Sequence, residues 1–383
     1  MNHTHVNRML DLAIQIQQVP APTLDEKQRA EFVYNLFLTE GLKDVSIDPL
    51  NNVFGRLPGR GKKQPLIISA HLDTVYPRST NLHFTREEDR IYGPGIGDNS
   101  LGVAALFGLL WLLRDRKINL QGDIWFTANV SEEGLGDLRG MRAVVERFNS
   151  NIQAYLVLEG TAFGHIYHQA IGVRRYRINV RTAGGHSWSD YGQPSAVHEL
   201  ARIVTQITAL PLPTDPRTTL NVGLLYGGTG VNVLASGAYL ELDLRSEDPE
   251  VLNNLIQRVE EKIKLANREG VEVEMEVIGQ RPAGEIGIDH PLVRLADECL
   301  SELGVKATFT SGSTDANIPL SLGYPALVLG ITSGGGTHTV HEYIETTPIE
   351  KGMEQLVSFV SRVWDVGQTQ PFFNPSTSNT SNG

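Results

Sequence analysis

Short apolar runs alternate with stretches of helical spacing through the first part of the chain. Runs at 66–70, 122–130 and 155–158 have the length and composition of buried strands, and helices are predicted between them. The same alternation resumes after residue 281 and ends in a helix predicted at 348–363. This pattern predicts an α/β fold in which a sheet is flanked by helices.

The middle of the chain has a different order of elements. Four predicted strands and two predicted helices follow one another as β-α-β-β-α-β, which is typical of a ferredoxin-like α+β fold. We therefore expect an inserted domain at 173–280, between the two parts of a larger domain at 1–172 and 281–366. The chain from 367 to 383 ends in Ser, Thr, Asn and Gly residues and is expected to be a disordered tail.

Each apolar run in the first part is followed by side chains that can bind a metal ion or move a proton. His71 follows the first run, Glu132 and Glu133 follow the second, and Glu159 follows the third. In open α/β sheets ligands bind beyond the carboxyl ends of the strands, so we expect these side chains to share one crevice. Asp73 lies two residues after His71, on the same face of an extended backbone, where a carboxylate can support a metal-binding imidazole.

A glycine-rich turn at 93–100 precedes an apolar helix predicted from about Leu101. Asp98 has two interpretations in this turn. It either caps the helix, where aspartate complements the helix dipole, or directs its carboxylate into the crevice. No Lys-Ser or Lys-Thr pair follows the glycines, so a phosphate-binding P-loop is not indicated.

Composition narrows the classes of function. The chain of 383 residues is 40% apolar and 20% charged, which is a globular balance. Its net charge of −11 disfavours nucleic acid and anionic membrane surfaces as partners. The longest apolar run, 101–113, is shorter than the ~20 residues that span a bilayer, and no secretory signal is visible, so we expect a cytoplasmic protein. The single cysteine, Cys299, excludes an internal disulfide and a multi-thiolate metal site.

Together these features resemble the M20 family of dinuclear zinc peptidases and amino-acid deacylases. The family includes carboxypeptidase G2-like, acetylornithine deacetylase-like, succinyl-diaminopimelate desuccinylase-like and peptidase T-like enzymes. The resemblance covers nearly the whole chain and implies a zinc-peptidase-like catalytic domain with an inserted lid that mediates dimerisation. It rests on motifs in the family's order: His71-x-Asp73, Gly97-Asp98, Glu132-Glu133, Glu159 and a late glycine-rich loop that contains histidine.

The resemblance implies two zinc ions in each subunit. His71, Asp98 and Glu159 would hold one ion. Asp98, Glu133 and His338 would hold the other, so Asp98 would bridge the pair. Imidazole nitrogens and carboxylate oxygens suit zinc on chemical grounds as well, and Co²⁺ or Mn²⁺ remains an alternative.

The same resemblance assigns the residues around the metal ions. Asp73 would orient the ring of His71. Glu132 would be the general base that takes a proton from the attacking water and passes it to the leaving nitrogen. Both His338 and His341 are candidates for the late ligand, and the spacing of the family motif favours His338.

The inserted domain would contribute to the substrate site. The segment 183–187 resembles the lid motif whose histidine, here His186, donates a hydrogen bond to the developing oxyanion in the neighbouring subunit, which implies a homodimer. Asn232 and Arg245 resemble positions that bind the substrate's backbone or carboxylate, with a surface salt bridge as the alternative for Arg245. The substrate-facing loop of the family corresponds to Gly312, Ser313 and Thr314.

These features predict hydrolysis of an amide bond in a short peptide or an N-acyl amino acid. By resemblance, Glu159 favours a carboxypeptidase or deacylase, because aminopeptidase-type members tend to have aspartate at that position. A di- or tripeptide aminopeptidase and a metal-binding protein without hydrolytic activity are the alternatives. Many members carry Asp-Asp-Lys where this chain has Asp98-Asn99-Ser100, so we expect hydrogen bonding near the retained Asp98 to differ.

Overall fold

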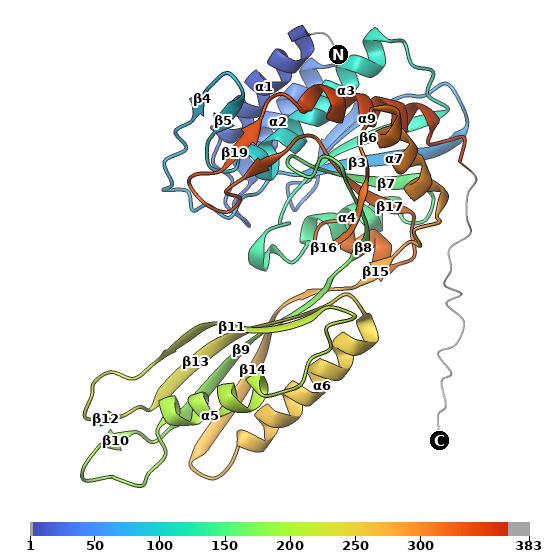
Figure 1. Cartoon of the computed structure of the whole chain (residues 1–383). Coiled ribbons are helices and arrows are strands. Elements are labelled where there is room, and N and C mark those ends of the chain that lie inside the picture. The colour runs from blue at the N-terminus through green and yellow to red at the C-terminus, as the bar shows by residue number, and fades with distance from the viewer. Residues whose placement is uncertain (1–2, 367–383) are drawn as a thin grey trace. The chain divides into compact units, whose positions relative to one another are not determined.

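A computed structural model describes residues 3–366, and the predicted tail at 367–383 lies outside the described residues (Figure 1). The chain forms two compact units. One comprises the residues up to Ala170 and those from Glu285 onward, and the other comprises Ile171–Gly284. The sequence places the inserted domain at 173–280, and the structure divides the chain two residues earlier at one end and four residues later at the other.

A mixed sheet forms the centre of the first unit. Its strands lie in the order β1-β2-β6-β3-β7-β17-β8-β15, and β16 pairs with β8. The neighbours β6, β3, β7 and β17 are parallel, whereas β1 and β2 are antiparallel additions at one edge. The predicted α/β class with a mixed sheet is confirmed. The strands are β1 (Lys43–Ile47), β2 (Val53–Leu57), β3 (Lys63–His71), β6 (Gly122–Asn129), β7 (Ala154–Glu159), β8 (His165–Ala170), β15 (Gly284–Glu285), β16 (Thr308–Gly312) and β17 (Ala326–Gly330).

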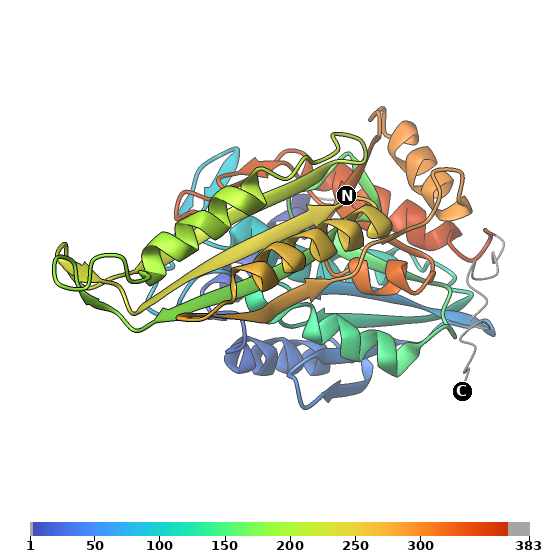
Figure 2. The ribbon, with the colours of Figure 1, turned by 90° about the horizontal axis from the view of Figure 1, so that it is seen from below.

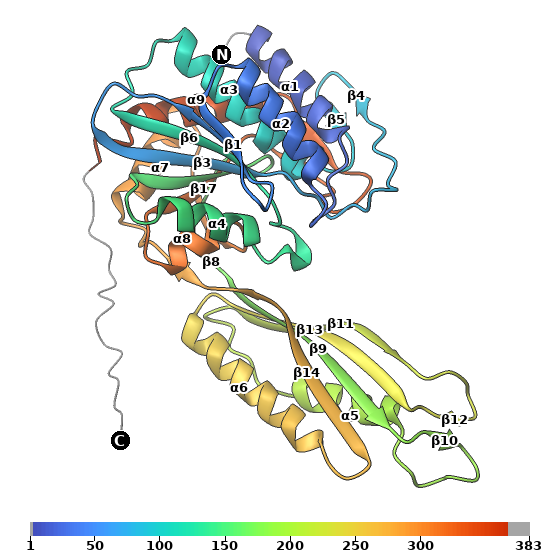
Figure 3. The same ribbon diagram turned by 180° about the vertical axis from the view of Figure 1, so that it is seen from behind.

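Helices cover both faces of this sheet. Helices α1, α2 and α3 lie on one face, and α4 and α8 lie on the other (Figures 1 and 3). The amphipathic helices α1 and α9 pack against α3, which itself contacts β3. The helices of this unit are α1 (His3–Gln17), α2 (Lys27–Thr39), α3 (Gly102–Asp115), α4 (Arg139–Phe148), α7 (Pro291–Glu302), α8 (Asn317–Ser321) and α9 (Ile349–Arg362).

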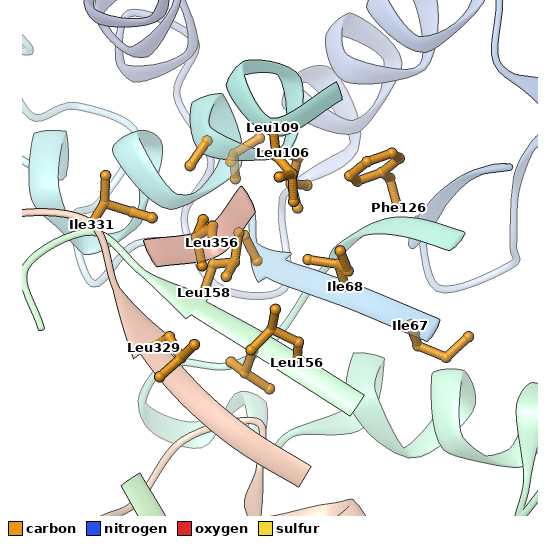
Figure 4. Packing of buried hydrophobic residues seen from close by; sticks show 14 of the residues in the cluster. Ile67, Ile68, Leu106, Leu109, Phe126, Leu156, Leu158, Leu329, Ile331 and Leu356 are labelled. Carbon is orange, nitrogen blue, oxygen red and sulfur yellow. The ribbon is translucent and has the colours of Figure 1, made fainter. Parts of the chain in front are cut away.

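Helix α3 is the centre of the apolar core. Its Leu106 and Leu109 are buried in one cluster with Ile68 of β3 and Phe126 of β6 (Figure 4). The segment Ile96–Asp115 is long and apolar enough to cross a membrane by composition, but 94% of its most apolar window is buried inside the protein. A helix that is apolar on every side is stabilised by burial on every side, so α3 is a core helix.

A small second sheet brings a late segment of the chain beside an early one. Its strand order is β18-β19-β5-β4, and Tyr343 of β19 pairs with Tyr92 of β5. The glycine-rich loop around His338 is thereby attached next to the turn that contains Asp98. These strands are β4 (Thr85–Arg86), β5 (Arg90–Tyr92), β18 (Gly334–Gly335) and β19 (Tyr343–Glu345).

The second unit is a four-stranded antiparallel sheet with two helices. The strand order β11-β13-β9-β14 is that of a ferredoxin-like fold. Helices α5 and α6 lie along one face of the sheet (Figure 2), where alternate strand residues such as Tyr176 and Leu242 are buried. The elements are β9 (Gly172–Thr182), β10 (Gly185–His186), α5 (Ala196–Thr208), β11 (Thr218–Gly227), β12 (Val233–Leu234), β13 (Gly237–Ser246), α6 (Pro249–Ala266) and β14 (Val271–Arg281).

Candidate metal centre

Three adjacent parallel strands bring four of the predicted side chains to one edge of the sheet. Strand β3 ends at His71 and β7 ends at Glu159, while β6 leads into Glu132 and Glu133. Because β3 lies between β6 and β7 and is parallel to both, the carboxyl ends of all three strands coincide. The strand order explains why residues far apart in the sequence share one site.

Asp73 joins the first two of these strand ends. Its carboxylate is fully buried and accepts the backbone N–H groups of Glu132 and Glu133, each at 2.9 Å. The Oγ1 hydroxyl of Thr23 donates a further hydrogen bond at 3.0 Å. The Nδ1 atom of His71 lies 3.0 Å from the Asp73 carbonyl oxygen and 3.6 Å from its carboxylate. Asp73 therefore positions the acidic pair and holds His71 on its Nδ1 side, which leaves Nε2 directed toward Asp98.

Asp98 lies at the centre of the cluster, in the turn η1 (Ile96–Leu101). Helix α3 begins at Gly102 with Leu101 at the capping position, so the interpretation of Asp98 as the helix cap is wrong. Asp98 Oδ1 lies 3.0 Å from His71 Nε2, and Oδ2 lies 3.1 Å from His338 Nε2. Each oxygen of this carboxylate thus has an imidazole of its own.

Glu133 and Glu159 complete the cluster, and each lies near a different histidine. The Nε2 atom of His338 lies 3.1 Å from Glu133 Oε1, and the Nε2 atom of His71 lies 3.9 Å from Glu159 Oε2. His338 itself has a left-handed backbone conformation, with φ of 65°. Of the two candidate late histidines, His338 is the one that meets Asp98 and Glu133.

Burial and crowding perturb the pKa values of these groups. Burial raises the pKa of Glu133 to about 7, and the nearby Asp98 and Glu132 carboxylates add to that effect. Burial likewise raises the pKa of Glu159 well above its usual value. Burial opposes ionisation of Asp98, but hydrogen bonds to His338 and His71 hold its pKa below the usual range. The pKa of His338 is raised to about 10 by its hydrogen bonds to Asp98 and Glu133. The cluster therefore carries more buried carboxylates than nearby cations can balance.

The donor set fits a divalent metal ion. One ligand atom from each of His71, Asp98 and Glu133 lies within 4.8 Å of the other two. Two imidazole nitrogens with carboxylate oxygens and no thiolate are a donor set that zinc, cobalt and manganese accept. Ligand imidazoles must be neutral, so binding of a metal ion would favour the neutral form of both histidines.

The loop after β16 contains the other predicted residues of this unit. Gly312 ends the strand, and Ser313 and Thr314 follow it. The next residue, Asp315, is fully buried and accepts a hydrogen bond of 2.7 Å from Asn129 at the end of β6. Burial and then the Glu132 carboxylate raise the pKa of Asp315 to about 7. The predicted substrate loop is thus attached to the strand that leads into Glu132.

The three lid residues lie in the second unit and are not all close together. His186 pairs with Val233 in the small β10–β12 ladder, and the Asn232 carbonyl accepts the N–H of Ser187, so His186 and Asn232 are neighbours. Arg245 lies near the other end of β13, eight residues beyond Gly237. At ~3.3 Å per residue, Arg245 is about 26 Å from Gly237 along the strand.

The side-chain contacts of two lid residues bear on their predicted roles. Arg245 Nε donates to Asp243 at 2.6 Å, so the ion pair that the sequence left open is present. The His186 Nδ1 atom accepts the N–H groups of Trp188 and Ser189 at 3.2 and 3.4 Å, which places the imidazole proton on Nε2. The contacts of His186 therefore suit a hydrogen-bond donor at Nε2.

Two buried residues of the centre have roles that were not predicted from the sequence. Glu342 is fully buried and accepts the N–H groups of Gly97 and Asp98, each at 2.8 Å. Asn99, where the chain departs from Asp-Asp-Lys, is also fully buried and bonds to the backbone on both sides of Glu159. Glu342 lies 245 residues from Gly97, and no periodicity or spacing connects such distant positions.

The fold and the cluster together define a metal-dependent hydrolase with an inserted α+β domain. The chain belongs to peptidase family M20/M25/M40, whose family model matches residues 67–362. It is 25% identical to succinyl-diaminopimelate desuccinylase of Corynebacterium glutamicum, over 89% of this chain and 92% of that protein. It is 27% identical to carboxypeptidase G2 of a Pseudomonas species, over 79% and 74%. A dinuclear metal-binding M20 peptidase of Bacillus subtilis has the same fold, with a TM-score of 0.70, 16% identity and coverage of 95% and 100%.

Proposed function

We propose that this M20-family hydrolase cleaves the amide bond of a short peptide or an N-acyl amino acid whose leaving side carries a free carboxylate. The observation that carries the proposal is the convergence of five potential ligands, His71, Asp98, Glu133, Glu159 and His338, beside the buried Glu132. Metal-dependent amide hydrolysis requires a metal site together with a carboxylate that can accept a proton.

The five ligands divide into two sets that share Asp98. His71, Asp98 and Glu159 would hold one zinc ion, and Asp98, Glu133 and His338 would hold the other. When bound, the ions would activate water and polarise the scissile carbonyl. Asp73 keeps the ring of His71 in place, because it lies next to that ring and also holds the backbone of the acidic pair.

Glu132 is the proposed general base. Its side chain is buried, and its backbone N–H is fixed by Asp73, so the carboxylate has a defined position at the end of β6. There it would take a proton from the attacking water and pass it to the leaving nitrogen. A protein that only bound metal would have no need of this group, which argues against the non-hydrolytic alternative.

Three features favour a substrate whose leaving side carries a carboxylate. By the family resemblance, Glu159 matches the carboxypeptidase and deacylase members rather than the aminopeptidases. The sequence relatives named above are a desuccinylase and a carboxypeptidase. Arg245 and Asn232 would bind the substrate's carboxylate and backbone, and the Gly312, Ser313 and Thr314 loop would face the substrate.

A panel of paired substrates tests this proposal. We expect the zinc-loaded protein to hydrolyse N-acyl amino acids or dipeptides with a free α-carboxylate. Amidation of that carboxylate is expected to lower kcat/KM by about 10- to 100-fold, because a charged hydrogen-bond partner is lost. Cleavage that instead requires a free amino group and tolerates the amidated end would establish the aminopeptidase alternative. No turnover on any substrate by zinc-loaded protein would establish the non-hydrolytic one.

We further propose that the protein works as a homodimer. His186 and Arg245 lie at opposite ends of the lid sheet, so a short substrate can contact both only if they come from different chains. Beside His186, Trp188 and Tyr191 are 87% and 89% exposed in the single chain. Exposed aromatic residues of this kind are frequent at protein interfaces. These features support a second copy that supplies His186 as the oxyanion donor.

Replacing His186 by alanine tests the contribution of the second copy. We expect kcat to fall by about 10²- to 10³-fold, the usual cost of losing one oxyanion donor, with zinc content unchanged. His198→Ala is the matched control, because His198 is exposed on α5 of the same domain. A purified monomer with full activity, or unchanged turnover of H186A, would rule out this role.

A further inference from the structure

Asn99 is bonded to the backbone on both sides of Glu159. Its Nδ2 donates to the Leu158 carbonyl at 2.9 Å, and its Oδ1 accepts the Gly160 N–H at 3.1 Å. The residue is fully buried and directly follows Asp98. An amide suits this place, because it offers both N–H donors and a carbonyl acceptor, whereas an ionised carboxylate could not donate to the Leu158 carbonyl. The position of Asp98 is thereby coupled to that of Glu159.

The backbone of the turn before Asp98 lies directly against the backbone at the end of β7, with no side chain between them. A Cβ atom on Gly160 would lie 2.0 Å from the Gly97 carbonyl oxygen, which is far inside van der Waals contact. The turn before Asp98 and the end of β7 therefore touch through their backbones. The two hydrogen bonds of Asn99 fix how these two segments are aligned.

Glu342 couples Asp98 to the other histidine. Its buried carboxylate accepts the N–H groups of Gly95 at 2.9 Å, Gly97 at 2.8 Å and Asp98 at 2.8 Å. The Tyr76 hydroxyl lies 3.0 Å from the same carboxylate and 2.7 Å from the Thr339 carbonyl, directly after His338. The turn that contains Asp98 and the loop that contains His338 are thus held by one buried group.

We propose that Asn99 and Glu342 are positioning residues, each of which aligns Asp98 with the remaining ligands of one metal ion. Asn99 serves the ion held with His71 and Glu159, and Glu342 serves the ion held with Glu133 and His338. The proposal rests on the two-metal function above. It follows from the placement of the contacts, because the two oxygens of Asp98 face different histidines and each positioning residue acts on a different side.

Variants that retain one site each allow the two roles to be separated. His338→Ala leaves the ligands of the first ion, and Glu159→Ala leaves those of the second. In each background, Asn99→Leu or Glu342→Gln is added, the protein is stripped with a chelator, and its Kd for Zn²⁺ is measured by competition with a fluorescent chelator. The matched control is Glu345→Gln, because Glu345 lies three residues beyond Glu342 and forms an ion pair with Arg90.

The two substitutions are expected to act on opposite sites. Asn99→Leu should raise the Kd about 10- to 100-fold in the H338A background, the usual effect of losing a residue that orients a ligand. It should change the Kd in the E159A background by less than about threefold. Glu342→Gln should show the reverse selectivity, and E345Q should change neither value. Glu342→Gln also removes a negative charge, which would weaken Zn²⁺ binding at both sites. Comparing the Kd in the two backgrounds separates this general effect from a positioning role.

Other outcomes identify which part is wrong. If the wild-type protein binds a pair of ions but each substitution weakens both sites equally, the positioning roles alone are overturned. A wild-type protein that binds no Zn²⁺ would overturn the proposed function itself. Circular dichroism monitors folding. If E342Q or N99L is unfolded, Tyr76→Phe and Asn99→Asp replace them, since each removes one of the described hydrogen-bond donors and nearly preserves side-chain size.

Discussion

Replacing Glu132 by glutamine is expected to lower kcat by about 10²- to 10⁴-fold, the usual contribution of a general base. Glutamine has the same shape but does not accept a proton at neutral pH. The backbone N–H of residue 132 would still donate to Asp73, so the strand end should keep its position. We therefore expect unchanged zinc content and an unchanged unfolding temperature. Turnover on the preferred substrate and metal analysis of the same preparation measure both effects.

Glu146→Gln is the control for this substitution, because Glu146 is exposed on α4 in the same part of the chain. Activity within about threefold of wild type in E132Q would exclude Glu132 as the base. Loss of zinc from E132Q would instead identify Glu132 as a ligand. Either result would require a different assignment of the two adjacent glutamates.

Replacing Asp98 by alanine is expected to remove both metal ions. Asp98 is the carboxylate that contacts both histidines, at 3.0 and 3.1 Å, so each set of ligands loses a member. Loss of the ions removes several kcal/mol of transition-state stabilisation, which corresponds to at least ~10³-fold in turnover. Metal analysis after gel filtration and steady-state kinetics measure the two losses.

The control for Asp98 is Asp89→Ala, an exposed acidic residue in the hairpin before the same turn. The D89A protein should bind metal and turn over substrate as the wild type does. Retention of one metal ion by D98A, with part of the activity, would show that the two sites do not share this carboxylate. Because D98A also loses the contacts of Asp98 with His71 and His338, circular dichroism of the same preparation checks that the protein is folded.

The sequence predicts the strand ends well because their chemistry is local. An apolar run followed at once by His71 or Glu159 fixes both the strand and the place of the side chain. Parallel pairing then brings such ends together in any α/β sheet. Asp98 was harder, because a glycine-rich turn before a helix is equally compatible with a helix cap. The position of Leu101 at the start of α3, together with the contacts of Asp98 with His71 and His338, decides between the two interpretations.

The residues that support the centre depend on contacts that no local pattern encodes. The departure from Asp-Asp-Lys at Asn99 predicts only that local hydrogen bonding differs, whereas in the structure Asn99 uses both ends of its amide on the flanks of Glu159. The family resemblance matches Glu342 to the acidic residue that follows the late ligand histidine, but it assigns that residue no role. Glu342 is fully buried because it meets a turn almost 250 residues earlier.

The lid shows a different limit of prediction. Alternation of apolar and polar positions gives its strands and helices, since one face of the sheet is buried under α5 and α6. The alternation does not show which residues of different strands lie at the same end of the sheet. Strand pairing shows this, and it places His186 and Arg245 at opposite ends.

The central claim is that metal ions held on Asp98 and a proton acceptor at Glu132 together hydrolyse the amide bond. Its most direct test is metal content and turnover measured on the same preparations of wild type, E132Q and D98A. We expect wild type to carry a pair of ions and turn over, E132Q to carry the ions without turnover, and D98A to have neither. Turnover at the wild-type rate in D98A that contains no metal would contradict the claim.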